Sequence, residues 1–172
     1  FRDAIQLKKL PDRVPVFLIP SFAPAFYAGM TPQEVMYDFD KANMAWKKFY
    51  MNFQPDAHGG AVVPGPGRFY DILDFKLYKW PGHGVAAEHT YQCIEGEYMK
   101  ADEYDSLIQD PSNFFRSVYH PRIFGALEPF KKLPPLPDLA EMYGSAGSFA
   151  PYGLPDVQAA YKALLEAGSE AL

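Results

Sequence analysis

The sequence has only one cysteine, Cys93, among its 172 residues. A disulfide within the chain is therefore excluded, and so is a metal centre built from several thiolates. Basic residues are not in excess either, because 16 lysines and arginines stand against 21 acidic residues and give a formal net charge of -5. A surface that coats nucleic acid needs a basic stripe, which this composition does not provide.

Long apolar runs are also absent. No stretch approaches the roughly 18 consecutive apolar residues that a membrane span needs, and no charged segment followed by an apolar leader is present. The composition is instead 48% hydrophobic and 16% aromatic, which is enough to form a sizeable core. We therefore expect a globular, cytoplasmic protein with neither nucleic acid nor a membrane as a partner.

The stretch from Thr31 to Asp74 predicts a helix, a strand and a loop in succession. Thr31, Pro32 and Glu34 have the pattern of a capping box with proline at the first helical position. A single long amphipathic helix should follow and end near Pro55, with an apolar stripe made of Val35, Phe39, Ala42, Trp46, Phe49 and Phe53. The apolar run at 57–63 predicts a buried strand that enters a loop of alternating proline and glycine at 63–67.

Shorter elements are expected on both sides of this stretch. A first strand is predicted at Val14–Ile19, a further strand at 76–80, and a strand or an irregular link at 91–98, with a stiff turn at 80–84. Helices are predicted at 2–8, 69–75, 101–108, 113–130 with an interruption near Pro121, and 155–165.

Strands that are few, and separated by helices longer than themselves, favour crossover connections and an α/β fold. A doubly wound sheet would have a glycine-rich turn after the first strand, and Pro20-Ser21-Phe22 is not such a turn. A (β/α)₈ barrel fits better, but a complete barrel takes roughly 200 to 250 residues. We therefore expect one incomplete barrel domain over residues 1–172, as the N-terminal portion of a longer protein.

Several motifs resemble the uroporphyrinogen decarboxylase superfamily. They are the run Pro11-Asp12-Arg13-Val14-Pro15-Val16, the turn Trp80-Pro81-Gly82-His83-Gly84, the segment Glu95 to Asp105, and Asp110-Pro111-Ser112. The resemblance covers essentially the whole chain and implies a (β/α)₈ barrel whose site lies at the carboxyl ends of its strands. The superfamily contains cofactor-free decarboxylases of uroporphyrinogen, and zinc-dependent methyltransferases that pass methyl groups to or from corrinoids and thiols.

The chain departs from the decarboxylase pattern in two places. Decarboxylases follow their first strand with arginines that pair with substrate carboxylates, whereas residues 20–27 here contain no arginine. The resemblance assigns a catalytic role to Asp71, in Asp71-Ile72-Leu73, although the proline-glycine loop lengthens the connection before it. The alternative is a solvated acidic residue on a helix. The methyltransferases bind zinc through histidine and cysteine in their C-terminal half, so zinc is expected only in the longer protein and no metal ligand is predicted in this chain.

Other residues are candidates because of their chemistry. His83 lies in a glycine-flanked turn from which an imidazole can reach a pocket, so we predict a catalytic role, with packing on Trp80 as the alternative. Substrate-binding roles are predicted for His58, Gly65, Gly67 and Tyr91. Their structural alternatives are an interior hydrogen-bonded histidine, a rigid turn and a packing tyrosine.

These observations lead to two hypotheses for the whole protein. The first is an enzyme that acts on a tetrapyrrole or on the methyl group of a corrinoid protein, by decarboxylation or by methyl transfer. The second is a non-catalytic barrel that binds a small molecule or a corrinoid protein. In either case we expect the present chain to be inactive alone, and to self-associate through exposed apolar strand edges, a homodimer being one such assembly.

Overall fold

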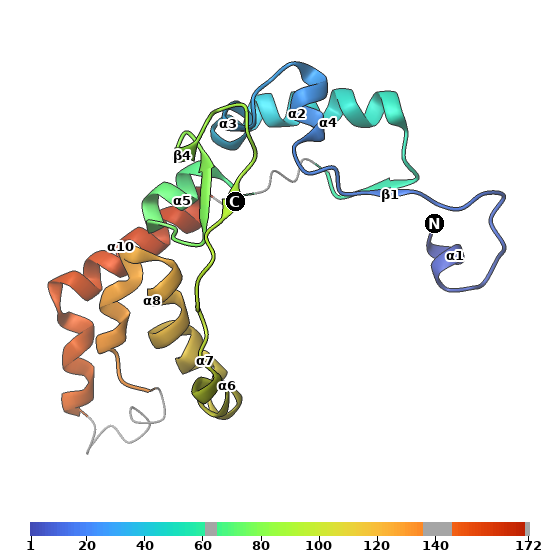
Figure 1. The fold of residues 1–172 in the computed structure, drawn as a ribbon. Helices are drawn as coiled ribbons and strands as arrows, with labels where there is room; N and C mark the ends of the chain where they lie inside the picture. The colour runs from blue at the N-terminus through green and yellow to red at the C-terminus, as the bar shows by residue number, and fades with distance from the viewer. Residues whose placement is uncertain (61–64, 136–145, 171–172) are drawn as a thin grey trace. The chain divides into compact units, whose positions relative to one another are not determined.

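The computed structural model describes residues 1–60, 65–135 and 146–170 (Figure 1). The fold is α/β, with 59% of the residues in helices and few, short strands. The chain divides into two compact units, of which unit 1 comprises Phe1–Gly67 and Trp80–Tyr91, and unit 2 comprises Arg68–Lys79 and Gln92–Leu172. Within the described ranges, no helix is long and apolar enough to cross a membrane.

In unit 1, the parallel strands β1 (Phe17–Leu18) and β2 (Ala57–His58) are joined by helices. After α1 (Arg2–Ile5), β1 pairs in parallel with β2, so that Phe17 lies opposite Ala57 and Leu18 opposite His58. The expected crossover connection is thus confirmed. The predicted length of the first strand is wrong, because only Phe17 and Leu18 of the stretch 14–19 pair. The predicted burial of the second strand is wrong at His58, which is exposed. The part of the predicted second strand at 61–63 lies outside the described residues.

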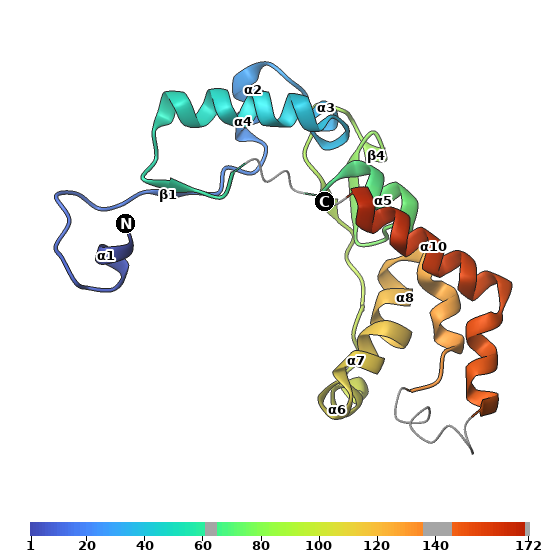
Figure 2. The same cartoon turned by 180° about the vertical axis from the view of Figure 1, so that it is seen from behind.

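Three helices form the crossover of unit 1. They are α2 (Ala23–Ala28), α3 (Pro32–Tyr37) and α4 (Phe39–Phe53), and both α2 and α3 pack on α4 (Figure 2). The capping box at Thr31 is confirmed, because its hydroxyl oxygen accepts from the Glu34 amide at 3.1 Å and the Glu34 carboxylate accepts from the Thr31 amide at 2.9 Å. The helix therefore begins at the predicted residue.

The prediction of one continuous helix over this stretch is wrong, because Asp38 separates α3 from α4. Its backbone is extended, with φ -129° and ψ 103°, and its carboxylate accepts from the Lys41 amide at 3.0 Å. An aspartate that caps a new helix competes with the ladder of the preceding one. The break also changes the burial of the stripe, since Val35 and Trp46 are buried while Phe39 is 70% exposed and Phe53 is 55% exposed.

β3 (Tyr78–Pro81) takes part in both units. Its first two residues pair antiparallel with β5 (Gln92–Cys93) within unit 2, and its last two pair with β4 (Gly84–Val85) within unit 1. The predicted turn at 80–84 is confirmed, because the Trp80 amide donates to the His83 carbonyl at 3.1 Å and the His83 amide donates to the Trp80 carbonyl at 2.7 Å. Gly82 makes this turn sterically accessible, with φ +83°.

Unit 2 is mainly helical. In the described part of unit 2 the helices are α5 (Gly67–Leu73, whose first residue belongs to unit 1), η1 (Ala101–Glu103), α6 (Tyr104–Gln109), α7 (Pro111–Phe114), η2 (Phe115–Tyr119), α8 (His120–Ile123), η3 (Gly125–Lys132), η5 (Ala146–Gly153) and α10 (Pro155–Glu170). The helices predicted at 69–75, 101–108 and 155–165 are confirmed with small shifts of their ends. The core contains Leu73, Leu127, Phe130, Leu133, Val157, Ala160 and Ala167.

The helix predicted at 113–130 has a more complex form than expected. η2 is π-helical and leads into α8, whose second residue is Pro121. A wider turn accommodates a proline because proline has no amide proton for the usual ladder bond. The chain then becomes extended at Phe124, with φ -128° and ψ 106°, before η3 begins.

Candidate functional site

The candidate site of unit 1 is built on one face of α3. Gln33 and Tyr37 are four residues apart, so their side chains lie on the same face of the helix. The capping box fixes where the helix begins and therefore which residues face this way. The backbone amide of Gln33 also donates to the Ala87 carbonyl at 3.1 Å, which attaches the start of α3 to the segment after the turn at 80–84.

The turn at 80–84 supplies an indole and an imidazole. Trp80 is 7% exposed, and its Nε1–H donates to the Tyr37 hydroxyl oxygen at 3.1 Å. The exposed ring of His83 stacks on the Trp80 ring, with centroids 4.6 Å apart and planes inclined by 18°. The same imidazole is nearly parallel to the Tyr37 ring at 6.4 Å and 16°. Three rings from two elements therefore form one aromatic group.

Two glycines allow the α3 side chains to approach the backbone. A Cβ at Gly67 would lie 2.3 Å from Cε2 of Tyr37, and a Cβ at Gly82 would lie 2.1 Å from Nε2 of Gln33. Both distances are far shorter than van der Waals contact, so any other residue would displace the side chain opposite. We call Gln33, Tyr37, Gly67, Trp80 and His83 the aromatic site.

The structure brings some predicted residues together and not others. His83 and Gly67 both lie against Tyr37, and Gly65, with φ +76°, precedes Gly67 by two residues. Tyr91 is half-buried and packs edge-on against Phe22 at 6.1 Å. Asp71 is exposed on α5 in unit 2. The catalytic and substrate-binding roles assigned to these residues stay predictions.

His58 belongs to a second aromatic pair of unit 1. Its ring stacks on Tyr50 at 3.9 Å and 14°, and its Nδ1 accepts from the Gly60 amide at 3.1 Å. The Tyr50 hydroxyl donates to the Gly60 carbonyl at 3.1 Å, and partial burial raises the pKa of Tyr50. The expected interior position of His58 is wrong because β2 is a two-residue strand with an exposed end. The histidine is nevertheless hydrogen-bonded, as that interpretation required.

The aromatic site is composed of polar and aromatic groups, and none of its five residues is a lysine, an arginine or an acidic residue. It offers an amide, a phenol and an imidazole beside a buried indole, so it can accept and donate hydrogen bonds and stack on a flat or apolar ligand. Because the Tyr37 oxygen accepts from Trp80, its own O–H becomes a stronger donor.

Sequence reasoning missed Gln33 and Tyr37. The available signal was their spacing of four on a helix with a well-defined start, on a face that the apolar stripe does not use. That signal shows a shared face but not what lies against it. The contact with the turn follows only from the fold.

An ion pair stabilises α3 at its first turn. Lys41 Nζ lies 2.6 Å from the Glu34 carboxylate. This hydrogen bond, together with the one from the Thr31 amide, lowers the pKa of Glu34 to about 2. Glu34 is therefore ionised at neutral pH and holds the helix that carries Gln33 and Tyr37.

Metal ligands do not gather in the described part of the chain. Among residues 1–60, 65–135 and 146–170, no group of three histidine, cysteine or acidic side chains is arranged to hold an ion, and Cys93 is exposed. Zinc sites with nitrogen and sulfur ligands need such a group.

No family model, no curated protein and no solved structure matches the chain.

Proposed function

We propose that the chain forms the first strands and helices of a (β/α)₈ barrel of the uroporphyrinogen decarboxylase superfamily, and that the whole protein acts on a corrinoid-linked methyl group. The barrel part of the proposal is supported by the parallel pair of β1 and β2 and by the helical crossover between them. A helix between parallel strands is the repeating unit of such a barrel.

The observation that carries the choice of substrate is that the site is aromatic and contains neither arginine nor lysine. A polycarboxylate tetrapyrrole requires cationic side chains that pair with its carboxylates. The site instead places His83, Trp80 and Tyr37 together, and α2, which follows the first strand, contains no arginine. Flat aromatic side chains suit the apolar edge of a corrinoid and the uncharged methyl group that it carries.

The site residues take different roles in this proposal. His83 contacts the substrate and accepts the proton that an acceptor thiol must lose before it takes a methyl group. Tyr37 is a positioning residue, because its hydroxyl oxygen receives the Trp80 Nε1–H and so holds the indole under the imidazole. Gly67 has no Cβ, so the Tyr37 ring can pack directly on its backbone.

Corrinoid binding to the chain tests this proposal. Methylcobalamin is titrated into the purified protein, and the change in the corrinoid absorption spectrum is followed. We expect saturable binding, weakened about tenfold by His83→Ala, which corresponds to about 1.4 kcal/mol. His89→Ala is the matched control, because His89 is an exposed histidine of the same unit outside the aromatic site.

Two results would contradict methyl transfer. Binding of a carboxylated tetrapyrrole with release of carbon dioxide would establish decarboxylation, and Asp71→Asn should then abolish that release. Saturable corrinoid binding with no methyl transfer to a thiol by the intact gene product would favour the non-catalytic binding barrel. Metal analysis of the same intact product reports whether zinc is part of the reaction.

A further inference from the structure

The N-terminal residues 1–19, here called the arm, expose apolar and basic side chains together. No arm residue is buried. Ile5, Leu7 and Leu10 are 66%, 92% and 91% exposed, and Lys8 and Lys9 lie between the two leucines. Exposed lysines are ordinary, but three large aliphatic side chains this exposed within six residues are not, because burial of such side chains is favourable.

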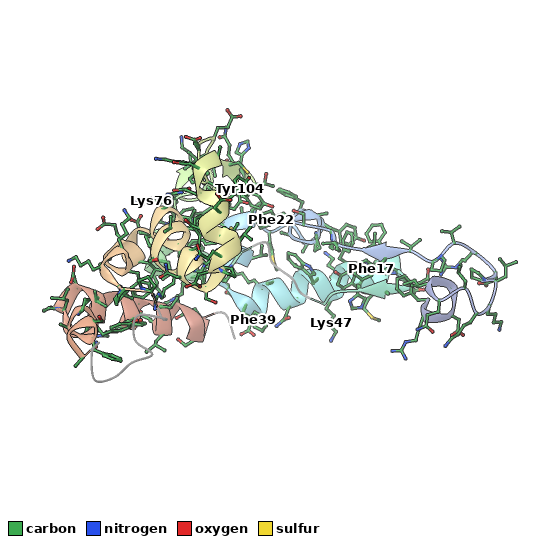
Figure 3. The ribbon with its side chains drawn as sticks, turned by 90° about the horizontal axis from the view of Figure 1, so that it is seen from below. Phe17, Phe22, Phe39, Lys47, Lys76 and Tyr104 are labelled. Carbon is green, nitrogen blue, oxygen red and sulfur yellow. The ribbon has the colours of Figure 1, made fainter. Side chains whose placement is uncertain are left out.

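The arm is nevertheless attached at its base. Arg13 Nη2 lies 2.7 Å from the Asp56 carboxylate, and the Val16 amide donates to the same carboxylate at 2.8 Å. Parallel pairing of β1 with β2 continues the attachment at Phe17, which Figure 3 labels. The apolar and basic segment is therefore presented from a defined position on unit 1.

The α6 face of unit 2 has complementary character. None of the residues of α6 is buried, and Tyr104 and Ile108, four residues apart, are 54% and 76% exposed (Tyr104 is labelled in Figure 3). The acidic side chains of Asp102 and Asp105, close to this apolar pair in the sequence, are also exposed. We define the α6 face as Asp102, Tyr104, Asp105 and Ile108.

The α6 face is held firmly on its unit by Arg122. Its guanidinium pairs with Glu103, between Asp102 and Tyr104, and donates to the Tyr98 carbonyl at 3.0 Å. The Tyr98 hydroxyl in turn donates to the Ile94 carbonyl at 2.9 Å. Glu103 is thereby used in contacts within unit 2, whereas Asp102 and Asp105 are exposed.

We propose that the segment Ile5–Leu10 of one molecule docks on the α6 face of a second copy of this chain. The aliphatic side chains of the arm cover Tyr104 and Ile108, and Lys8 and Lys9 meet Asp102 and Asp105. Both surfaces belong to one sequence, so a second copy supplies the complement without any other partner. The pairing of lysines with aspartates gives the contact its specificity, and the burial of apolar side chains gives it affinity.

Charge exchange tests the contact and shows whether it is made between molecules. Variant A carries Lys8→Glu and Lys9→Glu, and variant B carries Asp102→Lys and Asp105→Lys. Sedimentation velocity over a range of concentrations should show that the parent chain dimerises. Each variant alone should dimerise at least about tenfold more weakly, because it places like charges opposite each other.

Mixing the two variants gives the decisive measurement. The acidic arm of A matches the basic α6 face of B, and the basic arm of B matches the acidic α6 face of A, so the mixture should form a heterodimer. A monomeric mixture would overturn the proposal, and it would indicate docking within one molecule if each variant also loses stability. A monomeric parent chain would overturn it as well.

The control for altered net charge is Lys47→Glu with Lys162→Glu. Both lysines are exposed and lie outside the arm and the α6 face. This variant has the same change in charge as variant A and should dimerise like the parent chain. Equal weakening in the control would attribute the effect of variant A to net charge and would overturn the docking site.

Discussion

The Nε1–H of Trp80 donates to the hydroxyl oxygen of Tyr37 at 3.1 Å, and this bond joins the turn at 80–84 to α3. The two residues are 43 positions apart in the sequence. The bond therefore links a buried indole to a helix whose start is fixed independently by its capping box.

Replacing Tyr37 by phenylalanine removes the acceptor and retains the ring. We expect the free energy of unfolding of unit 1 to fall by about 1 to 3 kcal/mol, because a polar atom of a buried side chain loses a hydrogen-bond partner. Urea denaturation followed by tryptophan fluorescence measures the change. Tyr27→Phe is the control, since the 43% exposed Tyr27 accepts from Asn52 at the surface, and an equal loss there would contradict a special role for Tyr37.

Gly67→Ala tests the close approach of Tyr37 to the backbone. The added Cβ would lie 2.3 Å from Cε2 of Tyr37, so the ring must move, and overpacking of this kind costs about 1 to 3 kcal/mol. We expect lower stability and weaker binding of any ligand that uses His83. Thermal denaturation and the methylcobalamin titration report the two effects.

The matched control is Gly168→Ala on α10. A Cβ there meets nothing within 4 Å, and alanine favours a helix over glycine by roughly 0.5 to 1 kcal/mol. Gly168→Ala should therefore stabilise unit 2. If Gly67→Ala is also neutral or stabilising, Tyr37 does not pack over Gly67 as described.

Much of the local structure of unit 1 follows from the sequence, and its interruptions do not. Thr31 and Glu34 accept hydrogen bonds from backbone amides within one helical turn. Their effect is local, so the start of the helix can be predicted from the sequence. At Asp38 the chain can either continue the first helix or end it and cap a new one. These two alternatives differ little in free energy, so the sequence pattern does not decide between them. The apolar stripe at Phe39 and Phe53 indicates a helix correctly, but it does not show that these rings stay exposed.

The candidate site shows the same division. The turn containing His83 is recognisable from its proline and glycine residues. The short sequence distance between His83 and Trp80 is enough to suggest that the two rings pack together. Tyr37 and Gln33 enter the site through a contact across the fold, which no pattern within α3 specifies. Asp71 and the two residues after it match a catalytic motif in sequence. Such a match does not predict that Asp71 belongs to unit 2.

The stability of unit 1 should fall in acid because of Glu34. Hydrogen bonds from Lys41 and the Thr31 amide lower the pKa of Glu34 from 4.5 to about 2 in the folded chain. The unfolded chain therefore takes up this proton first as the pH falls. The contribution of Glu34 is fully present above pH 4.5 and is lost as the pH falls to about 2.

Urea unfolding measured across that pH range checks this expectation. Glu34→Gln should flatten the dependence of stability on pH for unit 1. Glu88→Gln removes a charge from an exposed position of the same unit and should leave the slope unchanged. Identical slopes for the parent and Glu34→Gln would show that the ion pair with Lys41 does not form.

His120 gives unit 2 a pH dependence nearer neutrality. Burial lowers the pKa of His120 below 6.5, and its ring lies among those of Phe115 at 5.7 Å and Phe124 at 6.0 Å. A lowered histidine pKa means that the unfolded chain binds the proton more tightly. Stability is therefore highest above pH 6.5 and decreases as the pH falls through the folded pKa.

Comparison of the parent with His120→Gln tests this effect. The variant should lose the part of the pH dependence that begins at 6.5, as measured by unfolding at a series of pH values. His89→Gln, at an exposed position of unit 1, should retain it. Retention in His120→Gln would assign the pH dependence to another group.

Asp56 has a consequence for how β1 finds β2. Two strands of two residues provide too few ladder bonds to distinguish the observed alignment from one shifted by a residue. The Asp56 carboxylate, which receives both Arg13 and the Val16 amide, lies outside the strands and fixes that alignment. The register of β1 against β2 is thus determined mainly by Asp56, which lies beside the strands. Substitutions of the strand residues should therefore disturb the register less than substitution of this aspartate.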